Sequence, residues 1–218
     1  ALKDSCGNVY PIQKTESGAL AYLRNLPSKG YKTLARANGE AASPFTRKDD
    51  YHLDTPFYTI ALDENGHFTS IFDKENDREV LKPGQVGNLL RLYEDKPVYY
   101  DNWDIDAYYT EKSWPVNDLQ SMQWTEDGPV RTTLALTWRC SRSTITQKIH
   151  FYADTRRIDF ETVADWKEHQ HLLKAEFPVD IHSDEATFEV QFGNVTRKVH
   201  TNTSWDKARF ESCAQKWM

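Results

Sequence analysis

The sequence predicts an all-β protein of packed antiparallel sheets, a sandwich larger than an immunoglobulin domain. Apolar and polar residues alternate along several segments, which is the pattern of half-buried strands. No segment carries a sustained helical stripe of apolar residues. The chain also holds 7 Trp, 11 Tyr and 10 Phe among its 218 residues, and such rings favour sheets and give a core large packing area.

A small β segment is predicted over residues 1–37. Short strands are expected around Val9–Gln13, Ala19–Arg24 and Tyr31–Ala35, separated by turn residues. A meander of this size is too small to be stable alone. We therefore expect this segment to belong with a larger neighbour.

A linker is predicted over residues 38–50, which are poor in large apolar side chains. The large β-sandwich domain is then expected over residues 51–218. It begins with a hairpin whose arms are Phe57–Leu62 and Phe68–Phe72. The turn contains Asn65-Gly66, a pair that tolerates the positive φ angles of tight turns.

Longer strands are predicted in the second half of the chain, where the apolar and polar residues fall on opposite parities. Four strands are expected to turn these residues towards the core. They are Val130, Thr132, Leu134, Leu136 and Trp138 on the first strand, Ile145, Gln147, Ile149 and Phe151 on the second, Ile158 and Phe160 on the third, and Phe188, Val190 and Phe192 on the fourth. This alternation predicts antiparallel strands with one buried face.

Charge and hydropathy exclude two classes of partner. Lys and Arg total 27 against 33 Asp and Glu, a net charge of −6 without a basic run, so we expect no nucleic-acid partner. No window approaches the ~18 consecutive apolar residues of a membrane span, so we expect no membrane partner. The three cysteines, Cys6, Cys140 and Cys213, are widely spaced, which favours a reducing compartment and predicts a cytoplasmic location.

The densest group of candidate site residues is the run Tyr99–Tyr109. Asp and Asn side chains can bond vicinal hydroxyls, and aromatic rings can cover the apolar face of a sugar. A saccharide-facing loop is therefore predicted, although rings packed in a core and carboxylates that cap turns would give the same composition. The residues expected to lie next to the substrate are Asp101, Asn102, Trp103, Asp104, Asp106 and Tyr108.

Two further patterns leave alternatives open. On a strand, Asp104 and Asp106 would share a face at ~6.5 to 7 Å between Cα atoms, which allows the acid and nucleophile of a glycosidase. His169 and His171 would project to one side of an extended segment and could share a zinc ion, or simply be polar residues at a turn. Two ligands do not complete a site, so no metal ligand and no catalytic residue is assigned.

Four ordered blocks of sequence resemble glycoside hydrolase family 38, the α-mannosidases. The blocks are Asp54–Gly66 with Ser70–Asp73 and Arg78–Val80, then Asp101–Asp106, then Asp165–Glu168 with Leu172–Lys174 and Phe177–Ile181, and finally Gly193–Arg197 with Phe210-Glu211 and Lys216-Trp217. Their order and spacing together make the match specific. Leu2–Arg36 is similar to the small β domain that precedes the large one in that family.

The resemblance implies a galactose-mutarotase-like β-supersandwich. It also implies that the sandwich is incomplete, because family members continue into further strands beyond the position of Met218. An open sheet edge favours association, and a homo-oligomer is one form that this could take.

The resemblance further implies a parent enzyme that hydrolyses terminal α-mannosides with retention, through a covalent intermediate, in mannose metabolism. Family members hold a zinc ion and an Asp nucleophile in an N-terminal α/β barrel, which a helical domain follows. The motifs of that barrel are absent from this sequence. We therefore expect no cofactor in this chain, and zinc in the catalytic domain of the parent.

The predicted role is a non-catalytic scaffold that forms part of the wall of the substrate pocket and is inactive alone. Its partners would be the α-mannoside and the missing barrel and helical domains. One alternative is a stand-alone carbohydrate-binding or sugar-epimerising module. Another is pure scaffold, in which the aromatic loop contacts the missing barrel.

Overall fold

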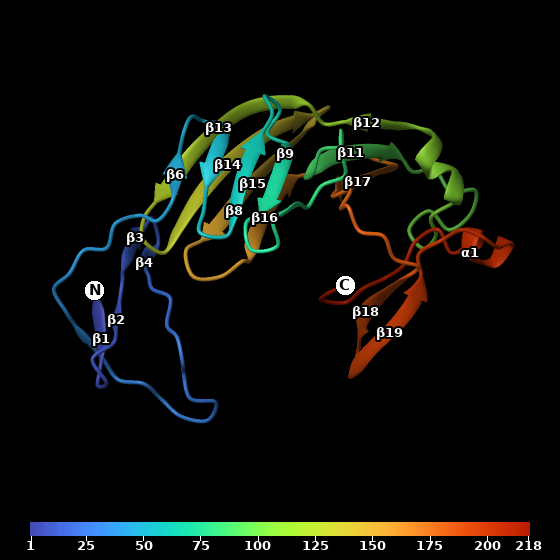
Figure 1. The fold of residues 1–218 in the computed structure, drawn as a ribbon. Helices are drawn as coiled ribbons and strands as arrows, with labels where there is room; N and C mark the ends of the chain where they lie inside the picture. The colour runs from blue at the N-terminus through green and yellow to red at the C-terminus, as the bar shows by residue number, and fades with distance from the viewer.

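The computed structural model describes residues 1–218 and is nearly all β (Figure 1). Its helical elements are the 3-10 helix η1 (Ala107–Glu111) and the short helix α1 (Ser204–Ala208). No helix has the length and apolar character that a membrane crossing requires. The all-β prediction is confirmed.

Two antiparallel sheets enclose the main core, and a third continues beside them (Figure 1). The four-stranded sheet has the order β13 (Asp118–Asp127), β14 (Arg131–Cys140), β15 (Ser143–Tyr152), β16 (Ile158–Asp165). The five-stranded sheet has the order β10 (Arg78–Glu79), β9 (Phe68–Asp73), β8 (Tyr58–Leu62), β7 (His52–Asp54), β6 (Thr46–Arg47). The third sheet has the order β12 (Ser113–Pro115), β11 (Leu89–Glu94), β17 (His171–Glu176).

The core lies between these sheets and uses the strand faces that the sequence predicts. On β14, Leu134, Leu136 and Trp138 are all fully buried. Phe68 of the five-stranded sheet meets Phe151 of the four-stranded sheet edge to face, with ring centroids 6.3 Å apart. Contacts of this kind bury large apolar area and join the two layers into one sandwich.

Phe192 is the exception to the predicted alternation. It lies between β18 (Glu185–Val190) and β19 (Gly193–Lys198) with a φ of +64°, and its side chain is fully exposed. The chain reverses there, so a residue that continues the parity of Phe188 falls in the turn and outside the buried face.

The predicted hairpin forms as β8 and β9, and its turn is fixed against the opposite sheet. Trp138 Nε1 donates to the Asn65 carbonyl oxygen at 2.8 Å. Gly66 has a φ of +81°, and a Cβ at this position would lie 2.9 Å from Leu136 Cδ2. Both the backbone angle and the close approach therefore require glycine.

The N-terminal segment forms two small sheets. One has the order β2 (Val9–Tyr10), β1 (Leu2–Asp4), β5 (Leu34–Arg36), and the other is the hairpin of β3 (Gln13–Thr15) and β4 (Gly18–Leu20). The expected strand from Val9 to Gln13 is thus split in two. Pro11 lies at the break, where its missing N–H cannot contribute to a ladder.

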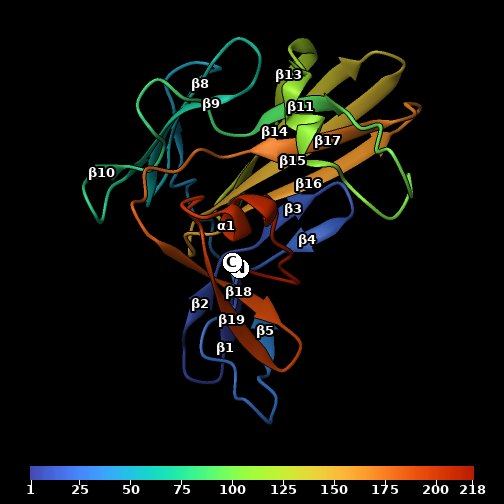
Figure 2. The same cartoon turned by 90° about the vertical axis from the view of Figure 1, so that its right-hand side faces the viewer.

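The two ends of the chain project from the sandwich. In both views β1, β2 and the hairpin β18–β19 lie below it, and in Figure 1 they lie at opposite ends (Figures 1 and 2).

The end of the predicted linker 38–50 packs with the sandwich. Phe45 is buried in the core, and Thr46 of β6 pairs with Asp54. The division of the chain into domains stays a prediction.

Candidate functional site

The predicted saccharide-facing residues lie in one loop, residues 95–112, between β11 and β12. Its two ends are held together, because the Glu94 N–H donates to the Lys112 carbonyl oxygen at 3.0 Å. Lys112 Nζ also lies 2.9 Å from Glu94 Oε1. The ammonium groups of Lys96 and Lys112 lower the pKa of Glu94 to about 2. Charge-assisted hydrogen bonds thus close the base of the 95–112 loop.

Asp104 and Asp106 do not lie on a strand, which corrects the geometry of the possible glycosidase pair. The chain turns at Tyr100, whose φ is +58° and whose carbonyl oxygen accepts from the Asp104 N–H at 2.9 Å. Asp104 Oδ1 then accepts from the Ile105 N–H at 3.0 Å. Asp106 Oδ2 accepts from the Val98 N–H at 2.8 Å. Each carboxylate is bonded to a different part of the loop backbone, and the shared strand face on which the predicted pairing depends is absent.

Asp106 and Tyr108 form a bonded pair inside the loop. The Tyr108 hydroxyl lies 2.7 Å from Asp106 Oδ2. This bond and the bond from the Val98 N–H lower the pKa of Asp106 and keep it ionised. The pair holds the shape of the loop, and 44% of the Tyr108 surface stays exposed.

Trp103 is the most exposed aromatic residue of the loop, at 90% of its surface. Tyr99 and Tyr100 are also exposed, and their ring centroids lie 6.4 Å apart. Asp101 and Asn102 are exposed beside them. Exposed flat rings allow a pyranose to stack, and exposed carboxylate and amide groups can bond its hydroxyls.

A cluster around the buried ring of Tyr109 holds η1, which lies at the C-terminal end of the loop. The Tyr109 hydroxyl donates to Glu211 Oε1 at 2.6 Å and accepts from Lys174 Nζ at 2.6 Å. Lys174 and Glu211 also form a direct ion pair. The Tyr93 ring packs edge to face on Tyr109, with centroids 5.1 Å apart. This Tyr109 cluster joins the loop to β11, to β17 and to the C-terminal segment.

Sequence reasoning missed two of these supports. Lys174 and Glu211 lie 65 and 102 residues from Tyr109, so no local spacing connects them. One signal was present: Lys174 interrupts the otherwise apolar run from Leu172 to Ala175. A charged residue within a half-buried strand needs a partner, and that partner is the cluster.

Asp95 was also missed, and it lies at the base of the loop. Its N–H donates to the Gln170 carbonyl oxygen at 2.9 Å, but its Oδ1 is buried without a hydrogen-bond partner. Burial, and the negative charges of Asp101 and Asp106, raise the pKa of Asp95. This unpaired, buried carboxyl oxygen is a cost in stability at the base of the loop, and no sequence signal separates Asp95 from other loop aspartates.

His169 and His171 are not arranged to bind one zinc ion together. His171 opens β17, and its Nδ1 lies 2.6 Å from the His169 carbonyl oxygen. Its ring faces Trp114, with centroids 6.0 Å apart. No group of three or more His, Cys, Asp or Glu side chains is arranged to hold a metal ion.

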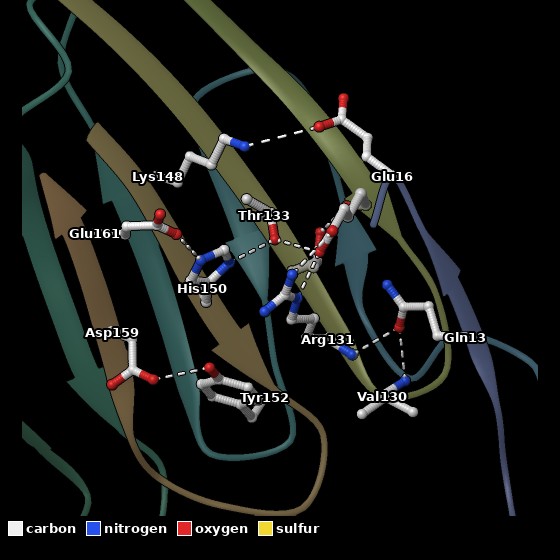
Figure 3. Close-up of polar contacts among 12 residues, drawn as sticks. Gln13, Glu16, Val130, Arg131, Thr133, Lys148, His150, Tyr152, Asp159 and Glu161 are labelled. Carbon is white, nitrogen blue, oxygen red and sulfur yellow. Dashed lines mark hydrogen bonds and ion pairs between the residues drawn. The ribbon is translucent and has the colours of Figure 1, made fainter. Parts of the chain in front are cut away.

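The outer face of the four-stranded sheet carries a second polar cluster, near the β3–β4 hairpin (Figure 3). Arg131 donates to Glu126 through Nε and Nη2 at 2.5 and 2.9 Å. The Thr133 hydroxyl donates to Glu126 Oε2 at 2.7 Å and so accepts from His150 Nδ1 at 2.8 Å. His150 Nε2 lies 3.5 Å from Glu161 Oε2. The charges of Arg131 and Glu126 are paired with each other, and the bonds of Thr133 and His150 extend this pair across two strands, so the cluster stabilises the sheet.

Comparison with known proteins identifies the family. Residues 53–218 match the model described as Glycosyl hydrolases family 38 C-terminal domain. Alpha-mannosidase G of Dictyostelium discoideum is 32% identical over 227 residues, which covers 94% of this chain and 21% of that protein. Alpha-mannosidase 2C1 of Homo sapiens is 35% identical over 168 residues, which covers 76% of this chain and 16% of that protein.

A solved structure shares the fold. The crystal structure of an alpha-mannosidase from Enterococcus faecalis V583 superposes with a TM-score of 0.62 at 12% identity, covering 94% of this chain and 29% of that chain. The present chain spans about a fifth of the length of the curated relatives that it matches. The match over residues 53–218, together with these relatives, shows that the chain belongs to glycosyl hydrolase family 38 and that residues 53–218 belong to its C-terminal domain.

Proposed function

We propose that this chain is the non-catalytic β-sandwich part of a zinc-dependent, retaining α-mannosidase, and that the 95–112 loop forms part of the wall of the substrate pocket. Membership of the family and the alpha-mannosidase relatives support the activity of the whole protein. The chain acts in this proposal as scaffold and wall, and the missing barrel and helical domains are its partners.

The residues of this chain do not fit a zinc site. No three ligand side chains converge, and His171 Nδ1 is engaged by a backbone carbonyl oxygen. In this proposal the zinc ion, the nucleophile and the acid come from other parts of the protein. The residues described here bind and orient the sugar, and no bond is made or broken on them.

The observation that carries the wall role is the exposure of Trp103 on a loop whose base is fixed. An exposed indole offers a flat apolar surface on which the apolar face of a sugar ring can stack. The Tyr109 cluster and the Glu94–Lys112 ion pair hold the backbone in place. A loop held in this way loses little conformational freedom when it binds.

The test is steady-state kinetics of the full-length enzyme that contains this chain, with an aryl α-mannoside as substrate. Trp103→Ala should raise KM and lower kcat/KM about tenfold, since it removes ground-state binding. Trp205→Ala is the matched control, because Trp205 lies on α1 with 76% of its surface exposed. A folded Trp103→Ala enzyme with an unchanged KM would leave the loop as scaffold only.

A second measurement addresses the intact 218-residue chain alone. We expect no turnover of the aryl α-mannoside, with or without added zinc. Turnover would refute the non-catalytic role. Epimerisation of a free sugar by the chain alone would instead favour a sugar-epimerising module.

We also infer a cytoplasmic location. Cys6, Cys140 and Cys213 are all free thiols, and Cys140 is buried. Chains that fold in oxidising compartments usually use their cysteines in disulfides. Fractionation of cells that express the full-length protein would test this inference.

The edge of β19 supports the prediction of association. The outer edge of β18 is partly covered by the C-terminal segment, because the Glu189 N–H donates to the Trp217 carbonyl oxygen at 3.0 Å and the Glu189 carbonyl oxygen accepts from the Gln215 N–H at 3.2 Å. β19 pairs only with β18, so its outer N–H and C=O groups have no ladder partner. We propose that β19 pairs with another part of the full protein or with a second copy. Sedimentation of the full-length protein and of the 218-residue chain would distinguish these two alternatives. A full-length monomer would favour pairing within the protein, and a full-length dimer would favour pairing with a second copy.

A further inference from the structure

A pocket of about 460 Å³ opens at one end of the sandwich, between β12 and the turn that joins β14 to β15. This volume lies within the range of small-molecule sites. Trp114 and Leu92 pair in register on β12 and β11 and both line the pocket. Tyr93, one residue on, points to the opposite face, so the pocket and the Tyr109 cluster lie on opposite sides of this sheet.

Trp114 supplies a flat apolar wall. It lies on the edge strand β12, and 42% of its surface is exposed. The His171 ring lies 6.0 Å from its ring, and Lys112 Nζ lies 5.4 Å from its centroid. The indole is therefore held by its neighbours while part of it stays open to the pocket.

Glu168 supplies a fixed hydrogen-bond acceptor. Its side chain is only 7% exposed, and Oε1 accepts from the Arg142 N–H at 2.9 Å and from Ser143 Oγ at 3.0 Å. These bonds lower its pKa and keep it ionised. The other oxygen, Oε2, lies 4.0 Å from Arg142 Nε, too far for a hydrogen bond. A buried carboxylate at a pocket wall thus keeps the capacity to accept from a ligand.

The remaining polar groups limit the chemistry of the ligand. Arg139 brings a positive charge to the lining, Asp118 and Glu168 bring negative charges, and Asn117 brings a neutral amide. With both signs present, neither a strong anion nor a strong cation is favoured. A hydroxyl group can donate to a carboxylate and accept from a guanidinium or an amide. A neutral polyhydroxy ligand with one apolar face fits all of these groups.

We propose that this pocket binds one pyranose residue of a saccharide, with its C–H face on Trp114 and its hydroxyls on Glu168, Asn117 and Arg139. The site is separate from the 95–112 loop. Only the choice of a mannoside as the probe rests on the proposed function. The chain would then contact saccharide at two places, the 95–112 loop and the pocket beside Trp114.

The test is a titration of the intact chain with methyl α-mannoside to about 10 mM, because a single-sugar site is expected in the millimolar range. Binding is followed by tryptophan fluorescence and by amide chemical shifts. Trp114→Ala should weaken the affinity at least tenfold, with the largest wild-type shifts at Asn117 and His171. Trp205→Ala, which removes an exposed indole elsewhere, should bind as the wild type does.

Folding is checked by the thermal midpoint of each variant. If Trp114→Ala does not fold, Asn117→Ala decides the question, because Asn117 is exposed and its truncation should weaken binding several-fold. Wild-type affinity in folded Trp114→Ala and Asn117→Ala would overturn the proposal, as would no binding at the highest concentration. Affinity lost in Trp103→Ala but kept in Trp114→Ala would overturn it too and assign binding to the loop. The kinetic test of Trp103→Ala in the full-length enzyme is independent of all these outcomes.

Discussion

Gln13 lies against Gly128 so closely that a Cβ on Gly128 would overlap the Gln13 side-chain amide. From this position Gln13 Oε1 accepts from the backbone N–H groups of Val130 at 3.0 Å and Arg131 at 2.9 Å (Figure 3). The Gln13 side chain is almost fully buried. One amide from β3 therefore satisfies the start of β14 and docks the N-terminal hairpin on the sandwich.

Gly128→Ala should lower the free energy of unfolding by about 1–3 kcal/mol. The new methyl group displaces the Gln13 amide and leaves the buried Val130 N–H without an acceptor. Gly193→Ala is the matched control, because a Cβ there meets nothing within 4 Å. Urea unfolding followed by circular dichroism measures both, and equal losses in the two variants would contradict the docking role of Gln13.

Gly66 and Gly84 form a second matched pair, with φ angles of +81° and +72°. A Cβ at Gly66 would lie 2.9 Å from Leu136 Cδ2, whereas a Cβ at Gly84 meets nothing within 4 Å. Gly84→Ala should cost about 1–2 kcal/mol of stability from backbone conformation alone. Gly66→Ala should cost about 1–3 kcal/mol more, because it also overpacks the core.

The comparison uses the denaturation midpoint and the m-value of each variant. Losses that agree within about 0.5 kcal/mol would show that the hairpin turn moves away from Leu136 and that the sandwich does not fix it.

The strands of the four-stranded sheet could be predicted because alternation is a local property. The parity of Leu134, Leu136 and Trp138 alone places them on one buried face, and the structure confirms it. Phe192 breaks the same pattern because a turn depends on backbone angles that parity does not report. The split at Pro11 has the same cause, since the backbone chemistry of one residue overrides the pattern around it.

The composition of the candidate site could be predicted from the sequence, but its geometry could not. The run from Tyr99 to Tyr109 lies in one loop, which exposes the rings of Tyr99, Tyr100, Trp103 and Tyr108 and buries that of Tyr109. Asp104 and Asp106 accept from the loop backbone and do not share a strand face. Its support by Lys174 and Glu211 depends on contacts between distant parts of the chain. Sequence spacing carries no information on such contacts, because the fold alone brings the partners together.

His150 should make stability depend on pH. Its side chain is 7% exposed, and burial together with the charge of Arg131 lowers its pKa below the ordinary value of 6.5. The carboxylates of Glu161 and Glu126 act in the opposite direction. Glu161 is 65% exposed, so water screens its charge. The lowering of the His150 pKa by burial is therefore larger than the raising by the carboxylates. The unfolded chain then binds this proton more readily than the folded chain, so stability is present above pH 6.5 and is lost as the pH falls through the folded-state pKa.

The variant His150→Gln does not titrate in this range and can still bond Thr133. The free energy of unfolding of the wild type should exceed that of the variant at pH 8, and the difference should shrink as the pH is lowered towards 5. Urea unfolding at pH 8, 7, 6 and 5 measures it. A difference that grows towards pH 5 would mean that Glu161 dominates and that the direction of the shift is reversed.

Tyr109→Phe tests whether the Tyr109 cluster orders the 95–112 loop. The change removes the hydroxyl that donates to Glu211 and accepts from Lys174, while the direct Lys174–Glu211 ion pair remains. We expect a loss of about 1–2 kcal/mol in the free energy of unfolding. We also expect faster amide hydrogen exchange at Val98, whose N–H donates to Asp106 directly before η1, and at Trp103, whose N–H is bonded in the turn that lies between Val98 and Asp106.

Tyr31→Phe is the matched control, since Tyr31 is 89% exposed and its hydroxyl should contribute little. Exchange rates at Val98 and Trp103 should be unchanged in this variant. If Tyr109→Phe lowered stability but left these rates at the wild-type values, the loop would keep its shape through the Asp106–Tyr108 pair and the Glu94–Lys112 ion pair alone. The Tyr109 cluster would then serve to attach the C-terminal segment to β17, and the presentation of Trp103 would not depend on it.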